Sequence, residues 1–434
     1  MIFSEVVEGQ ELKHIEPGTI IRKGKAARGI RGQNNTGIVL DDELLSKHIL
    51  ALGSIGSGKS NLMYHIVNSI IGSVTENDII VFFDAKGDYL SEFYRKDDLV
   101  IGNKNRLHSK YNVALWNIYK DIIMSPEEEQ LDTIREITSS LFKKYIDSSQ
   151  NPTFIMGARD ILTALITCHL REMKDKNVTW NNKKLKDLLN KSVAKDLREN
   201  ISKYDDLLWA TSYIMNDKSP TTQSYLSPLF MVAQEVFTGS FADEGNFSIR
   251  EAIQNKGGKS IFLEYDIANG NVLQAIYTVL IDLAMKEALG QNKTKGNVFF
   301  ILDEFPLIPK LNYMDNALNF GRSLGVKVIA GIQNIGQVEN TYSKPLAQSL
   351  LSGFGTFFCF KLFDENSRKI ISERHGKNRR KVGVMSSNYF KGVNDSLMIM
   401  NAIEDWDIVK LNVGQCIVSL LNEEPFFFQP LLYK

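Results

Sequence analysis

This 434-residue chain has few cysteines and no net charge. Its three cysteines, Cys168, Cys359 and Cys416, lie far apart and form no C-x-x-C pair. This usage argues against a structural zinc site and indicates a reducing compartment. The 51 Lys and Arg residues balance 51 Asp and Glu residues, so the whole chain lacks the basic excess typical of nucleic-acid-binding proteins. A DNA partner would therefore need a local basic surface, which an oligomer would concentrate.

Long apolar runs and catalytic histidine patterns are also missing. The longest apolar stretches, such as Ile161–Leu170, fall short of the roughly 18–20 residues that a membrane-spanning helix needs. The N-terminal MIFSEVVEGQELKH is too acidic for a signal peptide. We therefore predict a cytoplasmic protein with no membrane span of its own. None of the six histidines has metal-ligand spacing, and no Ser/His/Asp or Cys/His arrangement suggests nucleophilic catalysis.

A glycine-rich loop with a specific spacing follows the apolar stretch Ile49–Leu52 and precedes the helical pattern of Asn61–Ile71. Its residues are Gly53, Ser54, Ile55, Gly56, Ser57, Gly58, Lys59 and Ser60, which fit G-x-x-x-x-G-K-[ST]. Such a loop directs backbone N–H groups at a phosphate, and the following helix N-terminus adds partial positive charge. Lys59 would reach the β- and γ-phosphates of ATP, and Ser60 would bind Mg²⁺. The alternative is a glycine turn without a ligand, but chance matches to this pattern rarely lie between a strand and a helix.

Alternating strand and helix patterns predict an α/β fold with a mostly parallel central sheet. We expect strands at 49–52, 78–84, 260–265, 298–303, 326–333, 356–360 and 415–420. Residues 121–245 show helical periodicity with almost no strand signal, and Ser125-Pro126-Glu127-Glu128 resembles a capping-box start. The predicted organisation is an N-terminal lead-in (1–40), the first part of a nucleotide-binding domain (41–120), an inserted all-α domain (121–245) and the second part (246–434).

Polar residues follow two of the predicted strands. Asp303 and Glu304 lie at the end of the predicted strand 298–303, where Asp303 would hold Mg²⁺ and Glu304 would activate the attacking water. Gln333 ends the next strand and could sense the γ-phosphate. Without a catalytic role, Glu304 would be a surface acid at a strand end. Without a sensing role, Gln333 would be a turn residue at a strand end.

Three groups of basic residues could have either a functional role or a merely solvated one. Arg322 lies on a predicted helix near 313–324 and could act as an arginine finger toward a neighbouring subunit. Most arginines on surface helices are simply solvated. The sharpest basic cluster is Arg374, Lys377, Arg379, Arg380 and Lys381, and its pattern does not distinguish a pore lining from an exterior surface. A second basic run, residues 20–29, could contact a phosphate backbone but is more typical of a solvated loop or hairpin.

These motifs together resemble the type IV secretion coupling proteins of the TraD/TrwB class, within the HerA/FtsK-like P-loop translocases. The resemblance depends on H-I-L-A-L-G-S-I-G-S-G-K-S (48–60), D-A-K-G-D (84–88), D-E-F-P (303–306), G-R-S-L-G (321–325) and G-I-Q-N (331–334). It covers roughly residues 20–430. It implies a RecA-like ATPase domain assembled as a hexameric ring, with ATPase roles for Lys59, Ser60, Asp303, Glu304 and Gln333, and a role across subunits for Arg322.

The resemblance also implies DNA as the substrate and ATP with Mg²⁺ as cofactors. The first hypothesis is a DNA-stimulated ATPase that moves DNA toward a secretion channel, partnered by a relaxase or a secretion-channel protein. Because family members usually begin with transmembrane helices, a membrane-anchor protein would recruit this chain to the inner face of the cell membrane. The alternatives are a soluble translocase in DNA processing or phage defence with a nuclease partner, and an ATP-gated adaptor for protein substrates.

Overall fold

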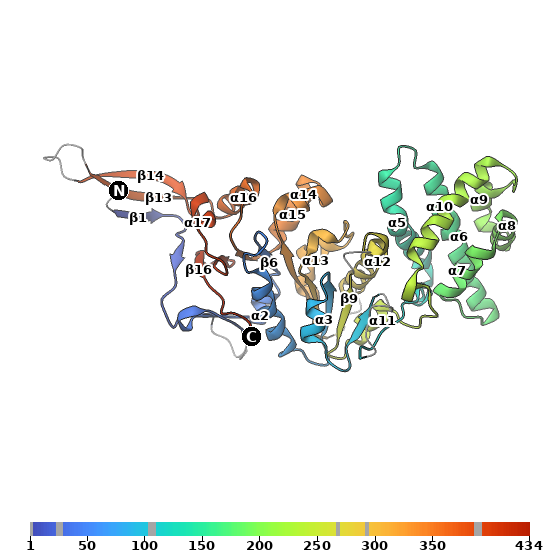
Figure 1. Cartoon of the computed structure of the whole chain (residues 1–434), viewed down its shortest axis with the longest axis horizontal. Helices are drawn as coiled ribbons and strands as arrows, with labels where there is room; N and C mark the ends of the chain where they lie inside the picture. Colours follow the sequence, from blue (N-terminus) through green and yellow to red (C-terminus); the bar gives the residue numbers. More distant parts are fainter. Residues whose placement is uncertain (1–2, 23–28, 103–109, 266–269, 291–294, 386–392) are drawn as a thin grey trace. The chain divides into compact units, whose positions relative to one another are not determined.

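The computed structural model describes residues 3–22, 29–102, 110–265, 270–290, 295–385 and 393–434. The chain forms two compact units, whose helices and strands are drawn in Figure 1. Unit 1 comprises Met1–Thr75, Gly296–Leu307 and Met314–Lys434, and unit 2 comprises Glu76–Lys295 and Ile308–Tyr313. Each unit is built around its own set of strands and helices.

The largest group of strands in unit 1 follows the order β2-β16-β15-β12-β6-β11-β10. The pairs β12·β6, β6·β11 and β11·β10 are parallel, whereas β15 pairs antiparallel with both β12 and β16. Strands β6, β10, β11 and β12 are buried along their whole length, as near-continuous apolar runs require in a sheet covered on both faces. The bounds are β2 Lys13–His14, β6 Ile49–Leu52, β10 Val298–Leu302, β11 Val326–Ile332, β12 Thr356–Cys359, β15 Cys416–Ser419 and β16 Phe426–Phe428.

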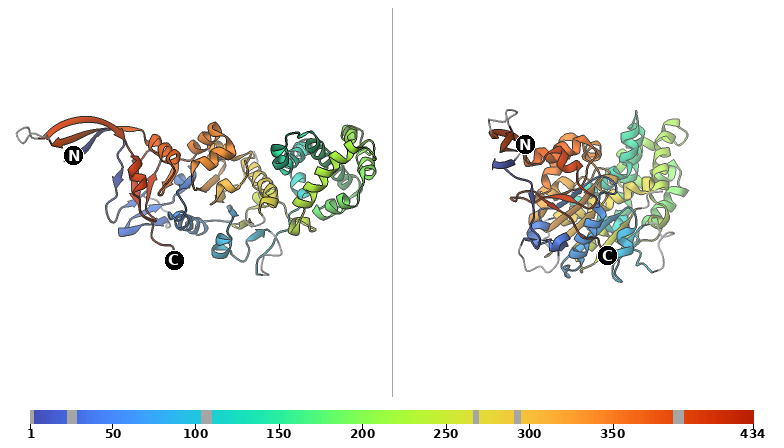
Figure 2. Two further views of the ribbon diagram at one scale, coloured as in Figure 1. Left: turned by 45° about the horizontal axis from the view of Figure 1, so that its top comes forward. Right: turned by 60° about the vertical axis from the view of Figure 1, so that its left-hand side comes forward.

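Two smaller sheets complete the strands of unit 1. One has the order β3-β5-β4, formed by β3 Ile20–Ile21, β5 Gly37–Val39 and β4 Gly29–Arg31. The other has the order β1-β13-β14, formed by β1 Phe3–Glu8, β13 Lys377–Met385 and β14 Val393–Asn401, and Figure 2 shows it as an extended antiparallel ribbon. The strands of both small sheets are short or strongly charged, so they carry a weak periodic signal in the sequence.

The helices of unit 1 are interspersed with its buried strands along the chain. They are α1 Asp42–Leu45, α2 Lys59–Ile71, α13 Met314–Phe320, α14 Ile335–Tyr342, α15 Lys344–Gly353, α16 Glu365–His375 and α17 Asp405–Val409, with 3₁₀ turns η1 Gln33–Asn35, η6 Phe305–Leu307 and η7 Gly321–Leu324. The predicted helix near 313–324 is therefore shorter than expected, because its last part is the 3₁₀ turn that carries Arg322.

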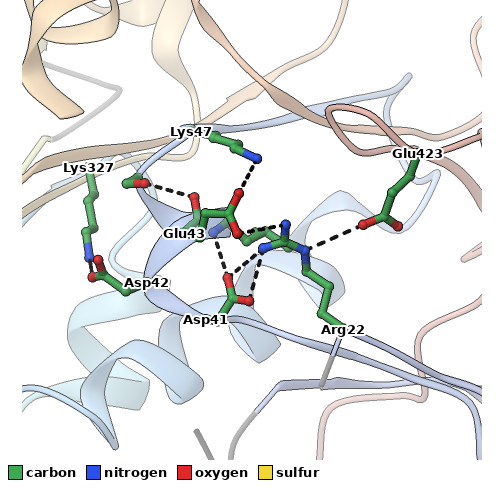
Figure 3. A network of polar contacts seen from close by, with 9 residues as sticks. Arg22, Asp41, Asp42, Glu43, Lys47, Lys327 and Glu423 are labelled. Atoms are coloured by element: carbon green, nitrogen blue, oxygen red, sulfur yellow. Dashed lines mark hydrogen bonds and ion pairs between the residues drawn. The ribbon is translucent and has the colours of Figure 1, made fainter. Parts of the chain in front are cut away.

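A charged network surrounds the short helix α1, which leads into β6. Figure 3 shows Arg22, Asp41, Asp42, Glu43, Lys47, Lys327 and Glu423. Arg22 contacts Asp41 at 2.8 Å and Glu43 at 3.3 Å, and the Lys327 side chain, which is 2% exposed, forms an ion pair with Asp42. Because Lys327 belongs to β11, the network joins the N-terminal segment to the strand that lies beside β6.

Unit 2 combines a small parallel sheet with a large helical region. The strand order is β7-β9-β8, with β7 Ile79–Asp84, β9 Ser260–Glu264 and β8 Leu99–Ile101. Within residues 121–245, every element that the structure describes is helical. The helices are α3 Asp88–Phe93, α4 Ile118–Ile123, α5 Gln130–Ser148, α6 Thr153–Lys176, α7 Asn182–Lys191, α8 Ala194–Ile201, α9 Leu208–Thr211, α10 Pro220–Val236, α11 Ile249–Asn255 and α12 Gly270–Leu289, with 3₁₀ turns η2 Glu127–Glu129, η3 Asp205–Leu207, η4 Ser212–Ile214 and η5 Gly239–Ala242.

A polar cluster lies in the interior of unit 2. The Asp121 carboxylate accepts hydrogen bonds from Trp116 Nε1 at 2.6 Å, Ser248 Oγ at 2.6 Å and the Arg250 backbone N–H at 3.0 Å. Arg250 Nε forms an ion pair with Glu287 Oε2 at 2.7 Å, and both side chains are 8% exposed. This cluster satisfies charges that would otherwise be costly to bury.

The capping box predicted at Ser125 is wrong. Residues 127–129 form the 3₁₀ turn η2, and no side chain caps either η2 or α5. Ser125 Oγ is instead buried, where it bonds Thr133 Oγ1 at 2.8 Å and accepts a hydrogen bond from Arg250. The Ser125 hydroxyl, which the local pattern predicts at a helix end, therefore makes tertiary contacts instead.

Among the described helices, α6 is long and apolar enough, by length and composition, to cross a membrane. No single apolar run in the sequence reaches that length. The most apolar window of α6 is 67% buried, as in the core helix of a folded domain. This is weak evidence for a membrane span.

Candidate nucleotide-binding site

Three parallel strands of unit 1 bring the predicted site residues to one edge of the sheet. Strand β11 lies between β6 and β10, with Ile332 opposite Leu52 and Ala330 opposite Leu302. The residues that follow these strand ends are Gly53, Gln333 and Asp303. The Gly53 N–H donates to the Ile332 carbonyl at 3.2 Å, which holds the start of the glycine-rich loop against β11.

His48 helps to hold this strand pairing. Its Nδ1 accepts the Val328 N–H at 3.0 Å, so the ring joins the residue before β6 to β11. Burial lowers the pKa of His48 to about 4, and the imidazole is therefore neutral at physiological pH. The histidine that opens the 48–60 motif thus has a structural contact in this protein.

The glycine-rich loop adopts a conformation that requires glycine at two positions. Gly56 and Gly58 have φ values of 73° and 113°, in the left-handed region that side chains disfavour. A Cβ on Gly58 would also lie 2.8 Å from the Gly414 Cα, and the Gly414 N–H donates to the Ser57 carbonyl at 2.9 Å. The helix α2 then begins at Lys59, so its first N–H groups lie next to the loop.

The polar groups of the loop fit a phosphate ligand. Lys59 Nζ donates to the Gly53 carbonyl and, at 3.3 Å, to the Ser54 carbonyl, so the ammonium lies across the loop. Ser57 is 5% exposed, and its Oγ has no hydrogen-bond partner within the described part of the chain. A buried hydroxyl without a partner is costly, and a phosphate oxygen is a ligand atom that could accept from it. Ser60 at the start of α2 is exposed and accessible to a metal ion.

The acidic pair and Gln333 form a second part of the site. Asp303 and Glu304 follow β10 and are half-buried, and Gln333 Nε2 donates to Glu304 Oε1 at 2.8 Å. A Cβ on Gly331 would lie 2.2 Å from the Asp303 backbone oxygen, so the two strands approach closely here. The glutamine therefore orients the carboxylate that would act as the base.

Arg322 does not join these residues within one chain. It is exposed on η7, just before the amino end of β11, whereas Gln333 follows the carboxyl end of that strand. Seven residues of strand span about 20 Å. Within the described residues its guanidinium makes no hydrogen bond or ion pair. Any contact of Arg322 with a nucleotide would therefore involve a neighbouring copy.

The basic cluster 374–381 ends α16 and begins β13. Arg374 lies over the Phe357 ring at 3.9 Å and donates to the Phe354 carbonyl at 3.0 Å, while Arg379 pairs with Glu8 at 3.1 Å. Several of these charges thus have contacts within the chain. Residues 23–28 of the second basic run, 20–29, lie outside the described residues.

In unit 2, the Asp84 carboxylate of the 84–88 motif accepts the Gly87 and Leu90 N–H groups at 2.9 and 2.8 Å, so it caps α3.

A cavity that sequence patterns do not indicate adjoins the loop. It has a volume of about 1360 Å³ and is lined by one face of α2, by β4 and β5, by Val413 and Gly414, and by residues 429–434. No local pattern connects the C-terminal residues with α2, because the contact joins positions about 370 residues apart. The one local hint of this cavity is that two polar residues, Asn61 and His65, lie four positions apart and therefore on the same face of α2.

The sequence and the fold both match known proteins. The chain is 24% identical to the type IV secretion system-coupling protein VirD4 of Bartonella henselae over 303 residues, which cover 64% of this chain and 45% of VirD4. It is 21% identical to the coupling protein TraD of Escherichia coli over 332 residues, 75% of this chain and 42% of TraD. It therefore spans less than half the length of the curated relatives it matches.

A solved structure of the plasmid coupling protein TrwB in complex with ADP and Mg²⁺ has the same fold. The TM-score is 0.72 at 17% identity, covering 95% of this chain and 90% of the TrwB chain in that structure. The likeness confirms the predicted α/β P-loop fold. The family described as the type IV secretion-system coupling protein DNA-binding domain matches residues 33–422, and this chain belongs to that family.

Proposed function

We propose that this chain is an ATP-driven motor that moves DNA toward a type IV secretion channel, hydrolysing ATP at the subunit interfaces of a ring. The observation that carries the proposal is the shared edge of β6, β11 and β10, where the glycine-rich loop, the acidic pair and Gln333 meet. Family membership supports coupling as the cellular role.

The proposed roles follow the positions of the side chains. Bound MgATP would supply the phosphoryl group and the metal charge that neutralises its oxygens. The loop from Gly53 to Gly58 would bind the phosphates through its N–H groups, and Lys59 would turn from the loop carbonyls toward them. Ser60 and Asp303 would hold Mg²⁺.

Glu304 and Gln333 would act as a pair. Glu304 would accept a proton from the attacking water, and Gln333, which donates to Glu304 Oε1 at 2.8 Å, would keep the carboxylate oriented. A γ-phosphate at this edge would compete for the Gln333 amide. Gln333 therefore has a contact that would differ between ATP and ADP states.

Arg322 is proposed to act in a neighbouring subunit. Its exposure and its distance from Gln333 along β11 support a role across an interface. Arg322→Ala should reduce turnover by at least about 100-fold while nucleotide binding by the monomer persists. Mixing it with a Lys59→Ala chain should restore part of the activity, since mixed rings contain sites with an intact lysine and an intact neighbouring arginine. Absence of rescue at every mixing ratio would contradict a role across subunits.

The partners and the domain division are part of the same proposal. We propose DNA in the ring channel, a relaxase or secretion-channel protein as partner, and a membrane-anchor protein that recruits the chain from the cytoplasm to the membrane. The domain division remains 1–40, 41–120, 121–245 and 246–434, with the helical part facing the substrate proteins.

The decisive test is the ATPase rate with and without DNA, together with particle size under the same conditions. We expect DNA to stimulate turnover of a ring-sized particle at low salt, where phosphate contacts are strongest. Turnover that is insensitive to both single-stranded and duplex DNA would favour an ATP-gated adaptor. A chain that binds no nucleotide would refute the ATPase proposal itself.

A further inference from the structure

The cavity beside the loop runs along one face of α2. Gly58, Asn61, His65 and Asn68 line it at intervals of three, four and three residues, which places them on the same side of a helix. Gly58 is the last glycine of the phosphate loop, so the cavity begins where the phosphates would end. Its volume of about 1360 Å³ exceeds what a nucleoside needs, since drug-sized ligand pockets measure about 300–1000 Å³.

The C-terminal strap, defined as residues Pro430 to Tyr433, forms one wall of this cavity. The Leu431 carbonyl accepts from Asn61 Nδ2 at 2.9 Å and from His65 Nε2 at 2.8 Å. The Tyr433 N–H donates to Asn61 Oδ1 at 2.8 Å. The Asn61 side chain therefore uses both its donor and its acceptor on the backbone of the strap.

Aromatic and backbone contacts hold the rest of the strap. The Tyr433 ring meets the rings of Tyr64 and His65 edge-on, with centroids 5.5 and 5.4 Å apart. On its other side, the Leu431 N–H donates to the Arg31 carbonyl at 2.8 Å. The strap thus bridges β4 and α2 across the cavity.

The lining has the chemistry of a nucleoside site. Val413, Ile38 and Leu431 supply apolar surface against which a planar base could pack, whereas Gln33 and Gln429 supply amides that can both donate and accept. A mixed lining of this kind suits a purine and a ribose better than a purely apolar ligand. Asn61 also directly follows Ser60, so the strap is attached to the first turn of α2 beside the proposed metal ligand.

We infer that this cavity takes the nucleoside half of the bound nucleotide, and that the C-terminal strap, held by Asn61 and His65, controls nucleotide release. The inference rests on the proposed function, because it assumes phosphates on the loop from Gly53 to Ser60. A nucleoside seated between α2 and Gln429 would lie behind the strap, so release would require the Asn61 bonds to open. The strap would set the dwell time of ADP, a step that limits turnover in many enzymes.

The test measures release of the fluorescent analogue mant-ADP from the full chain by stopped flow. Asn61→Ala removes two hydrogen bonds to the strap and should speed release by about 10-fold or more. Tyr433→Ala, which changes no residue near the loop in sequence, should also speed release, by about three-fold. Asn366→Ala, an exposed asparagine on α16 that bonds Glu339 at 3.1 Å, is the matched control and should release at the parent rate.

Competition by inorganic pyrophosphate separates the strap from the phosphate loop. Pyrophosphate lacks a nucleoside, so Asn61→Ala and Tyr433→Ala should leave its affinity unchanged. Parent-like mant-ADP release in both variants would overturn the inference, and so would an equal loss of pyrophosphate and mant-ADP affinity. A parent chain that binds neither probe would refute the proposed ATPase function as well, whereas Lys59→Ala should weaken both probes together.

Discussion

The edge of β6, β11 and β10 in unit 1 and the Asp121–Arg250 cluster in unit 2 are both polar and partly buried, yet they are built in opposite ways. In the cluster, hydrogen bonds and the 2.7 Å Arg250–Glu287 ion pair satisfy the charges internally. At the edge, the Ser57 hydroxyl has no partner among the described residues, and Lys59 lies across backbone carbonyls. The cluster has the features of a stabilising element, and the edge has those of a site prepared for a ligand.

Glu304→Gln should give the largest effect on function. The amide cannot accept the proton of an attacking water, so turnover should fall by about 10²–10⁴-fold, while ATP binding persists. An amide oxygen can still accept from Gln333, so the fold should be preserved. Steady-state ATPase assays with a nucleotide-binding measurement would check this, and Glu373→Gln on the exposed part of α16 is the control. Retained hydrolysis would contradict the assignment of Glu304 as the base.

Arg250→Ala should give the largest effect on stability. It leaves Glu287 charged and buried without its partner, which costs about 3–5 kcal/mol of unfolding free energy. Chemical denaturation would measure the loss. Arg135→Ala, whose exposed side chain lies 3.4 Å from Asp132, should change stability by less than about 0.5 kcal/mol. Equal effects of the two substitutions would remove the contrast between the cluster and an ordinary surface pair.

Gly331→Ala should damage both properties at the edge. The new Cβ would lie 2.2 Å from the Asp303 oxygen, so β10 and β11 must separate. We expect a loss of about 1–3 kcal/mol in stability, together with weaker Mg²⁺-dependent nucleotide binding. Gly336→Ala, whose Cβ would meet only the Asn334 side-chain oxygen at 3.3 Å, serves as the control. Parent-like metal dependence in Gly331→Ala would argue against Asp303 as a metal ligand.

Asp282→Asn should give the smallest effect, a change in pH dependence. Burial raises the pKa of Asp282 from 3.8 to about 7, although the Asn312 and Tyr313 N–H groups favour the charged form. The folded state then holds a proton that the unfolded state releases, so stability should fall as pH rises from about 4 to 7, by at most about 1.4 kcal/mol per unit. Denaturation across this range should show a shallower slope in Asp282→Asn. The exposed control Asp187→Asn should keep the parent slope, and an unchanged slope in Asp282→Asn would contradict the raised pKa.

The fold class and the order of the site motifs could be predicted from the sequence, because both depend on local patterns. The apolar runs 49–52, 298–302 and 326–332 are strands as expected, and each ends in the residues predicted to carry chemistry. The failures occur where distant contacts override local preference. Ser125 bonds Thr133 and Arg250 in place of a helix end, and the charged stretch 377–385 pairs as β13 between β1 and β14.

Spacing and periodicity within short windows are enough to specify the glycine-rich loop, the acidic pair and the helical character of residues 121–245. Long-range packing, by contrast, places β11 between β6 and β10, so that Gln333 contacts Glu304 while Arg322 lies at the far end of the same strand. It also decided that the C-terminal strap packs on α2. Pairings between residues that are hundreds of positions apart depend on which surfaces exclude water together, and no local pattern records that choice.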